Sequence, residues 1–467
     1  MNKYRYLLAN TLLFALSGII VKILSFFMLP LYTGVLTTTE YGIAELMHTT
    51  IMLLTPVLSL SVAEAVIRFL LVKDCDKKAV FTASMVIIAA GTVVLALTKP
   101  LVEKLSPEIG EYFVYFLLLY FATTVENALF RFAKGLEKVK ACSLNGVIIV
   151  LVTIFTNLLL LLKFNMGLEG YLIAMIAAQA VSSIYLAVVC RVWKYCSMRG
   201  MKKTVTMEML AYSIPFIPTA IAWWINSAFD RYMLVFILGT AANGLFGVAS
   251  KIPAIINTVT SVFIQAWQIS GIKEYGDEEY EQFFANIYNL YNILMVLMVA
   301  VLIPITPVLA KFLFAGEFYE AWTYVPVLCI SSIFSGLTGV VASVFYAVKK
   351  TKILMHSTIS GAVVNIVLNY ILIKKMGING AGIATMVSFA VVFFVRYTEA
   401  RKYIRLKINL IRDIVSYILL VTEAVIMVMQ PKWMYIAAAA VAIVVVAINI
   451  GTLYRLASGK IRAIFGR

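Results

Sequence analysis

Apolar runs of about 20 residues recur along the whole chain, separated by short polar or charged stretches. Each run is long enough to cross the roughly 30 Å hydrocarbon core of a bilayer as an α-helix. We therefore expect an all-α polytopic membrane protein with about fourteen transmembrane helices. The predicted spans are 10–36, 41–62, 80–98, 112–133, 141–162, 169–190, 209–238, 245–270, 285–314, 321–347, 354–373, 378–398, 409–429 and 433–454.

Composition supports a membrane protein, because 62% of the 467 residues are hydrophobic and 13% are charged, against about a quarter charged in soluble domains. In a soluble protein the net charge of +16 would suggest a nucleic-acid partner. Here most Lys and Arg residues fall in loops on one side of the predicted membrane, as the positive-inside rule requires. We therefore expect no nucleic-acid partner and place both termini in the cytoplasm.

Cofactor chemistry has no visible basis in the sequence. The five cysteines show neither metal-ligand spacing nor a disulfide framework, and the chain has two histidines. No GxxxxGK[ST] motif is present, so direct use of ATP is not expected. We expect no metal site and no cofactor, and proton or sodium coupling stays open.

The chain contains an internal repeat. The stretch 165–189 matches 375–397 at an offset of about 210 residues, and both carry the pattern M-G-[LI]-x-G followed by an apolar helix. Asn157 and Asn369 correspond at nearly the same offset. Such repeats are common in transporters.

An even number of spans in each repeat gives the two repeats the same orientation in the membrane. We expect two six-helix bundles related by an axis along the membrane normal, with a substrate path between them. The predicted division is residues 1–200, residues 201–404, and residues 405–467 for two additional helices and a short cytoplasmic tail.

Several ionisable residues fall inside the predicted spans, where a charge is costly unless it faces a partner or water. Lys22, Asp230, Arg231 and Lys251 lie well within such spans. The surplus of cations predicts a basic lumen suited to an anionic group. A structural salt bridge between Asp230 and Arg231 is the alternative.

Polar residues at helical spacing form stripes on several predicted helices. We consider three roles for these stripes: lining a hydrated path, holding helices together by hydrogen bonds, and extending to the membrane surface near helix ends. The stripes comprise Glu45, His48, Thr55 and Ser59; Thr123, Asn127, Arg131 and Lys134; Lys251, Thr258, Ser261 and Gln265; and Asn365 with Asn369.

Two further ion pairs are candidates, the first of them at the inner mouth of the path. Glu64 and Arg68 are four residues apart, a spacing that allows a pair on one helix face. Glu126 belongs to no stripe and is a candidate partner for Arg131.

Three segments resemble polysaccharide transporters of the Wzx type, which are lipid-linked oligosaccharide flippases of the multidrug/oligosaccharidyl-lipid/polysaccharide (MOP) superfamily. They are "SGIIVKILSFFMLPLYTGVLTTTEYGIAEL", "LSVAEAVIRF" and "SIPFIPTAIAWWINSAFDRYMLVFILGTAANGLFGVASKI". The resemblance covers the whole chain. It implies a V-shaped, MATE-like pair of bundles that alternates between inward-open and outward-open states around a cationic central cavity.

The resemblance also implies a substrate, an oligosaccharide repeat unit linked to undecaprenyl pyrophosphate, moved from the cytoplasmic to the outer leaflet. By position, Lys22, Arg231 and Lys251 would attract the pyrophosphate. Asp230 would hold one of these cations when the cavity is empty.

The same comparison suggests further roles. Trp223, Trp224 and Asn226 are candidate sugar contacts, with aromatic packing as the alternative. Glu45, His48 and the aspartate at position 230 are candidates for binding a coupling proton or sodium ion; an unperturbed histidine titrates near pH 6.5.

The implied setting is the bacterial inner membrane, in the synthesis of lipopolysaccharide O-antigen, capsule or a similar surface polymer, with lipid-linked oligosaccharide, the bilayer and polysaccharide polymerase machinery as partners. Alternatives are a peptidoglycan-precursor flippase, a MATE-type exporter of small molecules, and a membrane glycosyltransferase or polymerase. The short loops argue against the enzyme alternative, and we expect no catalytic activity.

Overall fold

The computed structural model describes residues 26–72, 75–197, 202–406 and 408–465, and within these ranges the chain is helical with no β-strand. Twelve helices in the described part are long and apolar enough to cross a membrane. They coincide with the second to twelfth and the fourteenth predicted spans. The prediction of an all-α polytopic membrane protein is therefore confirmed.

The two remaining predicted spans, the first and the thirteenth, are not among these twelve helices. The first begins in residues outside the described part. The thirteenth is a helix, α19 (Leu410–Met429), that carries three charged residues, Arg412, Asp413 and Glu423.

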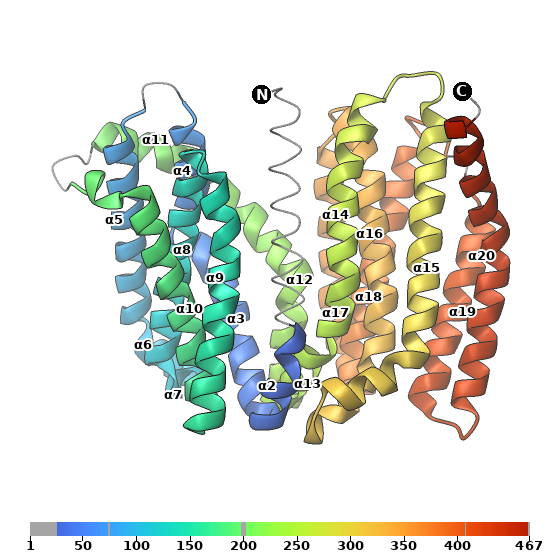
Figure 1. Ribbon diagram of the computed structural model, residues 1–467, viewed down its shortest axis with the longest axis horizontal. Helices are drawn as coiled ribbons and strands as arrows, with labels where there is room; N and C mark the ends of the chain where they lie inside the picture. Colours follow the sequence, from blue (N-terminus) through green and yellow to red (C-terminus); the bar gives the residue numbers. More distant parts are fainter. Residues whose placement is uncertain (1–25, 73–74, 198–201, 407, 466–467) are drawn as a thin grey trace. The chain divides into compact units, whose positions relative to one another are not determined.

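The chain divides into two compact units, Met1–Ala228 and Phe229–Arg467 (Figure 1). The division falls inside one long helix, α12 (Phe216–Leu238). The three-part division at residues 200 and 404 stays a prediction.

The first unit is built from helices of very different length. Its elements are α2 (Leu29–Val35), α3 (Thr38–Leu58), α4 (Val62–Leu70), α5 (Lys77–Leu97), α6 (Lys99–Leu105), α7 (Pro107–Glu111), α8 (Phe113–Gly135), α9 (Val139–Asn157) with a π-helical extension (Leu158–Lys163), α10 (Gly167–Cys190), a short 3-10 helix (Val192–Lys194), α11 (Lys203–Ser213) and the first part of α12.

Helix α8 organises this unit, because α4, α5 and α10 all pack against it. Small residues allow the close approach that drives helix association in lipid. A Cβ atom on Gly135 of α8 would lie 2.7 Å from the Cβ atom of Leu70 on α4, so only glycine fits there.

Two helices of the first unit, α3 and α5, begin with residues whose side chains cap the helix N-terminus. Thr37 and Glu40 form a capping box at α3, in which Thr37 Oγ1 accepts from the Glu40 amide and the Thr37 amide donates to Glu40 Oε2 at 2.8 Å. At α5, Asp76 accepts from the amide of Ala79 and pairs with Lys202 Nζ at 2.7 Å.

The second unit contains the longest helices. After the remainder of α12 these are α13 (Thr240–Ala249), α14 (Lys251–Lys273), α15 (Tyr280–Leu313), a 3-10 helix (Gly316–Tyr324), α16 (Val325–Ala347), α17 (Lys352–Met376), α18 (Ile378–Ala400), α19, and α20 (Met434–Phe465). Helix α18 packs against α16 and α17, just as α10 packs against α8 and α9 in the first unit.

The repeated M-G-[LI]-x-G pattern has the same structure in each unit. Gly167 and Gly377 both adopt positive φ, +52° and +60°, at the start of α10 and α18. Three residues later, a Cβ atom on Gly380 would overlap the Leu372 backbone near the end of α17, and one on Gly170 would crowd Met166 in the turn and Leu160 of the π-helical extension. The repeat inferred from the sequence therefore reflects a shared helix–turn–helix geometry.

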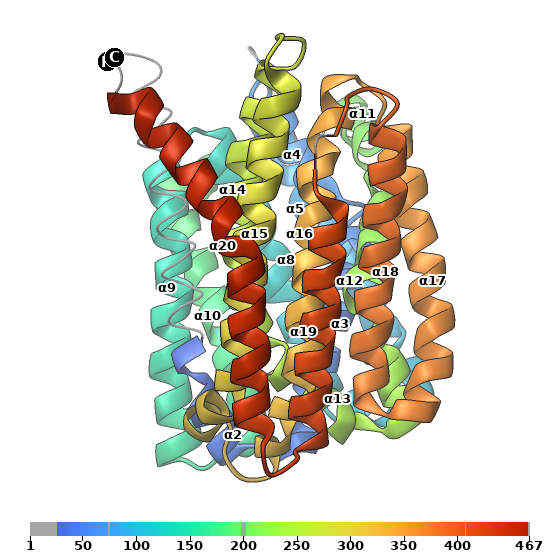
Figure 2. The same cartoon turned by 90° about the vertical axis from the view of Figure 1, so that its right-hand side faces the viewer.

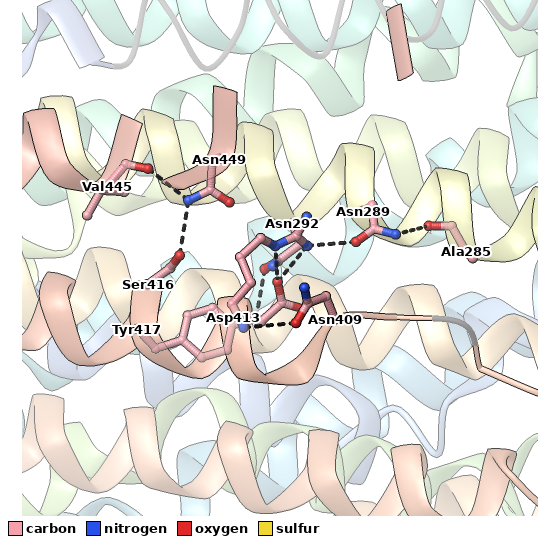
Figure 3. Close-up of polar contacts among 10 residues, drawn as sticks. Ala285, Asn289, Asn292, Asn409, Asp413, Ser416, Tyr417, Val445 and Asn449 are labelled. Carbon is pink, nitrogen blue, oxygen red and sulfur yellow. Dashed lines mark hydrogen bonds and ion pairs between the residues drawn. The ribbon is translucent and has the colours of Figure 1, made fainter. Parts of the chain in front are cut away.

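The two additional helices pack on the second unit, where α19 and α20 lie beside α15 (Figures 1 and 2). A buried polar network joins them (Figure 3). Arg412 pairs with Asp413 Oδ1 at 2.6 Å and donates from Nη2 to Asn289 of α15. Tyr417 donates to Asn292 Oδ1 at 2.7 Å. These contacts attach the N-terminal part of α19 to α15 by hydrogen bonds.

Candidate functional site

The first unit contains a partly open cavity of about 530 Å³, a size typical of small-molecule sites. Its wall is formed by α3, α4, α8, α10 and α12, all within Met1–Ala228. The lining residues are His48, Ile51, Met52, Thr55, Pro56, Ser59, Ser61, Ala63, Glu64, Leu119, Thr123, Asn127, Met175, Gln179, Phe216, Thr219, Ala220 and Trp223.

Two of the polar stripes predicted from the sequence face this cavity. His48, Thr55 and Ser59 contribute from α3 and the turn after it. Thr123 and Asn127 contribute from α8. Glu45, the first member of the α3 stripe, is buried and does not line the cavity.

The turn between α3 and α4 brings backbone strain to the cavity wall. Pro56 lies inside the last turn of α3, and the consecutive residues Leu60 and Ser61 adopt left-handed φ angles of 52° and 53°. Such conformations are costly for residues other than glycine and concentrate at functional sites. The turn places Ser59 and Ser61 in the lining and starts α4 so that Glu64 also reaches it.

The acid in the cavity wall has a different partner from the one expected. Arg131 Nη2 of α8 donates to Glu64 Oε1 of α4 at 2.8 Å. The expectation that Glu64 pairs with Arg68 is wrong, because the packing of α4 on α8 presents Glu64 to the neighbouring helix. Glu126 does not pair with Arg131 either; its Oε1 accepts from Asn145 Nδ2 at 2.6 Å.

The three candidate sugar contacts, Trp223, Trp224 and Asn226, have different surroundings. Trp223 lines the cavity. Trp224 is buried and donates from Nε1 to the carbonyl of Thr49 at 2.8 Å, so it holds α12 to α3. The Asn226 amide donates to the carbonyl of Ala222 within its own helix.

In the second unit, Asp230 of α12 is the first residue in a series of polar contacts that runs from α12 through α18 to α17. Asp230 is 7% exposed, its Oδ1 accepts from the Arg231 amide, and its Oδ2 accepts from the Thr385 hydroxyl of α18 at 3.4 Å. Thr385 Oγ1 lies 3.5 Å from Asn365 Nδ2, and Asn369 Nδ2 donates to Asn365 Oδ1 at 2.9 Å.

This chain unites three residues singled out from sequence with one that was missed. Thr385 lies on α18, which carried no predicted stripe, and its position between Asp230 and the α17 asparagines depends on packing alone. The Asn369 Oδ1 atom is buried without a partner in the described part of the chain. Carboxylate, hydroxyl and amide oxygens together can hold a proton or a hard cation.

The residues expected to form a cationic cavity are placed as follows. Lys22 lies outside the described residues. Lys251 begins α14 and is half-buried, and Gln265 further along that helix is exposed. Arg231 follows Asp230 on α12. Among described residues, the lining of the first unit's cavity contains no Lys or Arg. The cationic path therefore stays a prediction.

One buried acid outside these sites stands out. Glu423 of α19 is 0% exposed, and both of its carboxylate oxygens lack a hydrogen-bond partner within the described ranges. Its place in a predicted span was the only sequence signal. No group of three or more His, Cys, Asp or Glu residues that could hold a metal ion occurs in the described part.

The described helices have the fold of an all-α polytopic membrane protein, with a cavity in the first unit. Residues 7–268 match the family described as "Polysaccharide biosynthesis protein", which is more than half of the chain. The chain belongs to this family. An uncharacterized membrane protein of Methanocaldococcus jannaschii is 26% identical over 303 residues, which cover 60% of this chain and 70% of that protein.

Solved structures share the fold at low sequence identity. Lipid II flippase MurJ in an inward closed conformation has a TM-score of 0.70 and 13% identity, covering 95% of this chain and 99% of its own. An inward-facing multidrug resistance MATE family transporter has a TM-score of 0.68 and 15% identity, covering 83% and 98%. A MOP superfamily transporter from Pyrococcus furiosus has a TM-score of 0.57 and 15% identity, covering 84% and 95%.

Proposed function

We propose that this protein is a flippase that moves lipid-linked oligosaccharide units from the cytoplasmic to the outer leaflet during the synthesis of a cell-surface polysaccharide. The observation that carries the proposal is the cavity in the first unit. It combines an aromatic ring with many hydrogen-bonding side chains inside a membrane bundle, in a chain of the polysaccharide biosynthesis family. The likeness in fold to lipid II flippase MurJ supports a lipid-linked cargo.

The physical task suits alternating access between two bundles. A pyrophosphate and a polar glycan cannot cross hydrocarbon unaided, whereas a prenyl chain stays soluble in lipid. A wet path that opens to one leaflet at a time is therefore sufficient, and no bond needs to be broken. In this proposal Lys22, Arg231 and Lys251 attract the pyrophosphate of an undecaprenyl carrier, and the protein is not an enzyme.

Coupling to an ion gradient is assigned to the polar chain that starts at Asp230. The buried carboxylate, the Thr385 hydroxyl and the amide oxygens of Asn365 and Asn369 supply oxygen ligands from three helices. Binding of a proton or sodium ion there would bias how α12 packs against α17 and α18. Glu45 and His48 are the further candidates in the first unit.

In this proposal the protein lies in the bacterial inner membrane with both termini in the cytoplasm. The polysaccharide polymerase machinery is its partner, because a flipped repeat unit is consumed by polymerisation.

The test is leaflet transfer of a fluorescent undecaprenyl-pyrophosphate oligosaccharide in proteoliposomes. Wild type should transfer the lipid, while Asp230→Asn and Arg231→Ala should not, although both remain folded. Asp277→Asn, in the loop between α14 and α15, is the matched control and should transfer normally. Uptake of a cationic dye without transfer of any lipid-linked glycan would instead show a small-molecule exporter.

A further inference from the structure

We propose that the cavity of the first unit is a subsite for an uncharged sugar residue of the cargo and does not hold its pyrophosphate. This inference rests on the proposed function and specifies which chemistry the cavity recognises. It concerns the space walled by α3, α4, α8, α10 and α12.

The wall offers the two kinds of contact that a pyranose ring needs. One face of a pyranose is a sheet of C–H groups, which packs on the electron-rich face of an aromatic ring. Trp223 and Phe216 supply such rings from α12. The hydroxyl groups around the sugar edge need hydrogen-bond partners, and Asn127 and Gln179 supply amides from α8 and α10.

The charged residues of the cavity wall indicate which class of sugar the cavity binds. Glu64 faces the cavity, but its carboxylate is held at 2.8 Å by the Arg131 guanidinium, so the pair adds little net charge to the wall. Within the described residues no Lys or Arg lines the cavity, and the one imidazole in its lining, that of His48, cannot balance the several charges of a pyrophosphate. A buried charge without a partner is strongly disfavoured. An uncharged hexose or N-acetylated hexose is therefore the favoured occupant.

The test measures binding of lipid-free oligosaccharides to the purified full-length protein in nanodiscs, by isothermal titration calorimetry and tryptophan fluorescence. The probes are a panel of neutral hexose and N-acetylhexosamine oligosaccharides and a size-matched panel that contains uronic acids. We expect a neutral oligosaccharide to bind wild type, and Trp223→Ala and Gln179→Ala to weaken it about tenfold, the effect of losing roughly 1.4 kcal/mol.

Matched controls come from the same residue types elsewhere. Trp433→Ala, at the exposed turn between α19 and α20, and Gln282→Ala, exposed on α15, should leave binding unchanged. Equal binding of acidic oligosaccharides, or equal losses in the cavity and control variants, would overturn the subsite.

The outcome separates this inference from the flippase itself. If wild type transfers a lipid-linked glycan in proteoliposomes but binds no lipid-free oligosaccharide, the flippase stands and the sugar subsite is wrong. If transfer also fails, both fail together. Displacement of a bound neutral oligosaccharide by a lipophilic cation would assign the cavity to small-molecule export and overturn both.

Discussion

Arg131 of α8 and Glu64 of α4 lie 2.8 Å apart across 67 positions of the sequence, and Glu64 belongs to the cavity wall. The pair therefore does two things. It ties α4 to α8, and it offsets the charge of an acid that would otherwise face the cavity alone.

Breaking this pair should have a modest cost in stability and a clear effect on ligand charge preference. Because the two side chains are 31% and 37% exposed, we expect Arg131→Gln to lower the free energy of unfolding by about 1 kcal/mol. The uncompensated Glu64 should also let the cavity bind a lipophilic cation. A double-mutant cycle with Glu64→Gln, followed by thermal unfolding in detergent, measures the pair. Arg68→Gln is the control, and an equal effect there would contradict the assignment.

The Asp230 chain predicts a separation between ion coupling and sugar binding. Asp230→Asn keeps the size of the side chain but removes its charge, and Thr385→Val removes the hydroxyl that contacts it. Each should abolish transfer driven by a proton or sodium gradient and leave oligosaccharide binding in the first unit unchanged. Thr398→Val, at an exposed position of α18, should transfer as wild type does. Gradient-driven transfer retained in Asp230→Asn would exclude the carboxylate as the coupling group.

The pairing of Asp76 with Lys202 predicts a pH dependence of stability. The hydrogen bond from Lys202, helped by the Ala79 amide, holds the pKa of Asp76 below its ordinary value. The stabilisation is therefore complete above the unfolded-state pKa near 4 and is lost as pH falls through the lower folded-state pKa. Melting curves between about pH 7 and pH 3 should show Asp76→Asn less stable at pH 7 and converging with wild type in acid.

The control for that measurement is Asp277→Asn, since Asp277 makes no ion pair in the described part of the chain. Its difference from wild type should stay small at every pH. A difference for Asp76→Asn that does not shrink in acid would mean that the carboxylate charge is not what stabilises the cap.

The buried network that attaches α19 predicts a large effect of a single substitution. Arg412 is 8% exposed and Asp413 is 0% exposed, so Arg412→Ala leaves a buried acid without its cation. Breaking a buried pair in this way typically costs about 3–5 kcal/mol. We expect early proteolysis of α19 and a lower melting temperature, whereas Arg405→Ala in the preceding exposed loop should behave as wild type. A neutral Arg412→Ala would show that the network is dispensable for folding.

The repeated glycines predict a matched pair of outcomes. A Cβ atom at Gly380 would overlap the backbone of Leu372 at the end of α17, and one at Gly170 would crowd Met166 and Leu160. Gly380→Ala and Gly170→Ala should both reduce the yield of folded protein, the first more strongly because backbone cannot give way. Gly34→Ala meets no atom within 4 Å and should be tolerated. Tolerance at Gly380 would contradict the close helix contact.

Several features of the fold were predictable because they depend on local properties of the chain. The length of each apolar run fixes whether a helix can span a bilayer, and the runs found in the sequence became helices within the described ranges. The M-G-[LI]-x-G repeat was readable because glycine is required where φ is positive or where two helices meet. The polar stripes on α3 and α8 followed from helical periodicity, and both face the cavity.

Which side chains of different helices contact each other was not predictable from the sequence. The sequence by itself indicated that Glu64 and Arg131 lie close to the ends of predicted spans, and that Arg131 belongs to a polar stripe. Only the tertiary structure decided that they meet each other, while Trp224 turns to the Thr49 carbonyl and Thr385 joins Asp230. The physical reason is that helix periodicity fixes which residues share a face. Contacts across helices depend on the rotation and depth of each packed helix, which the sequence of one helix alone does not fix.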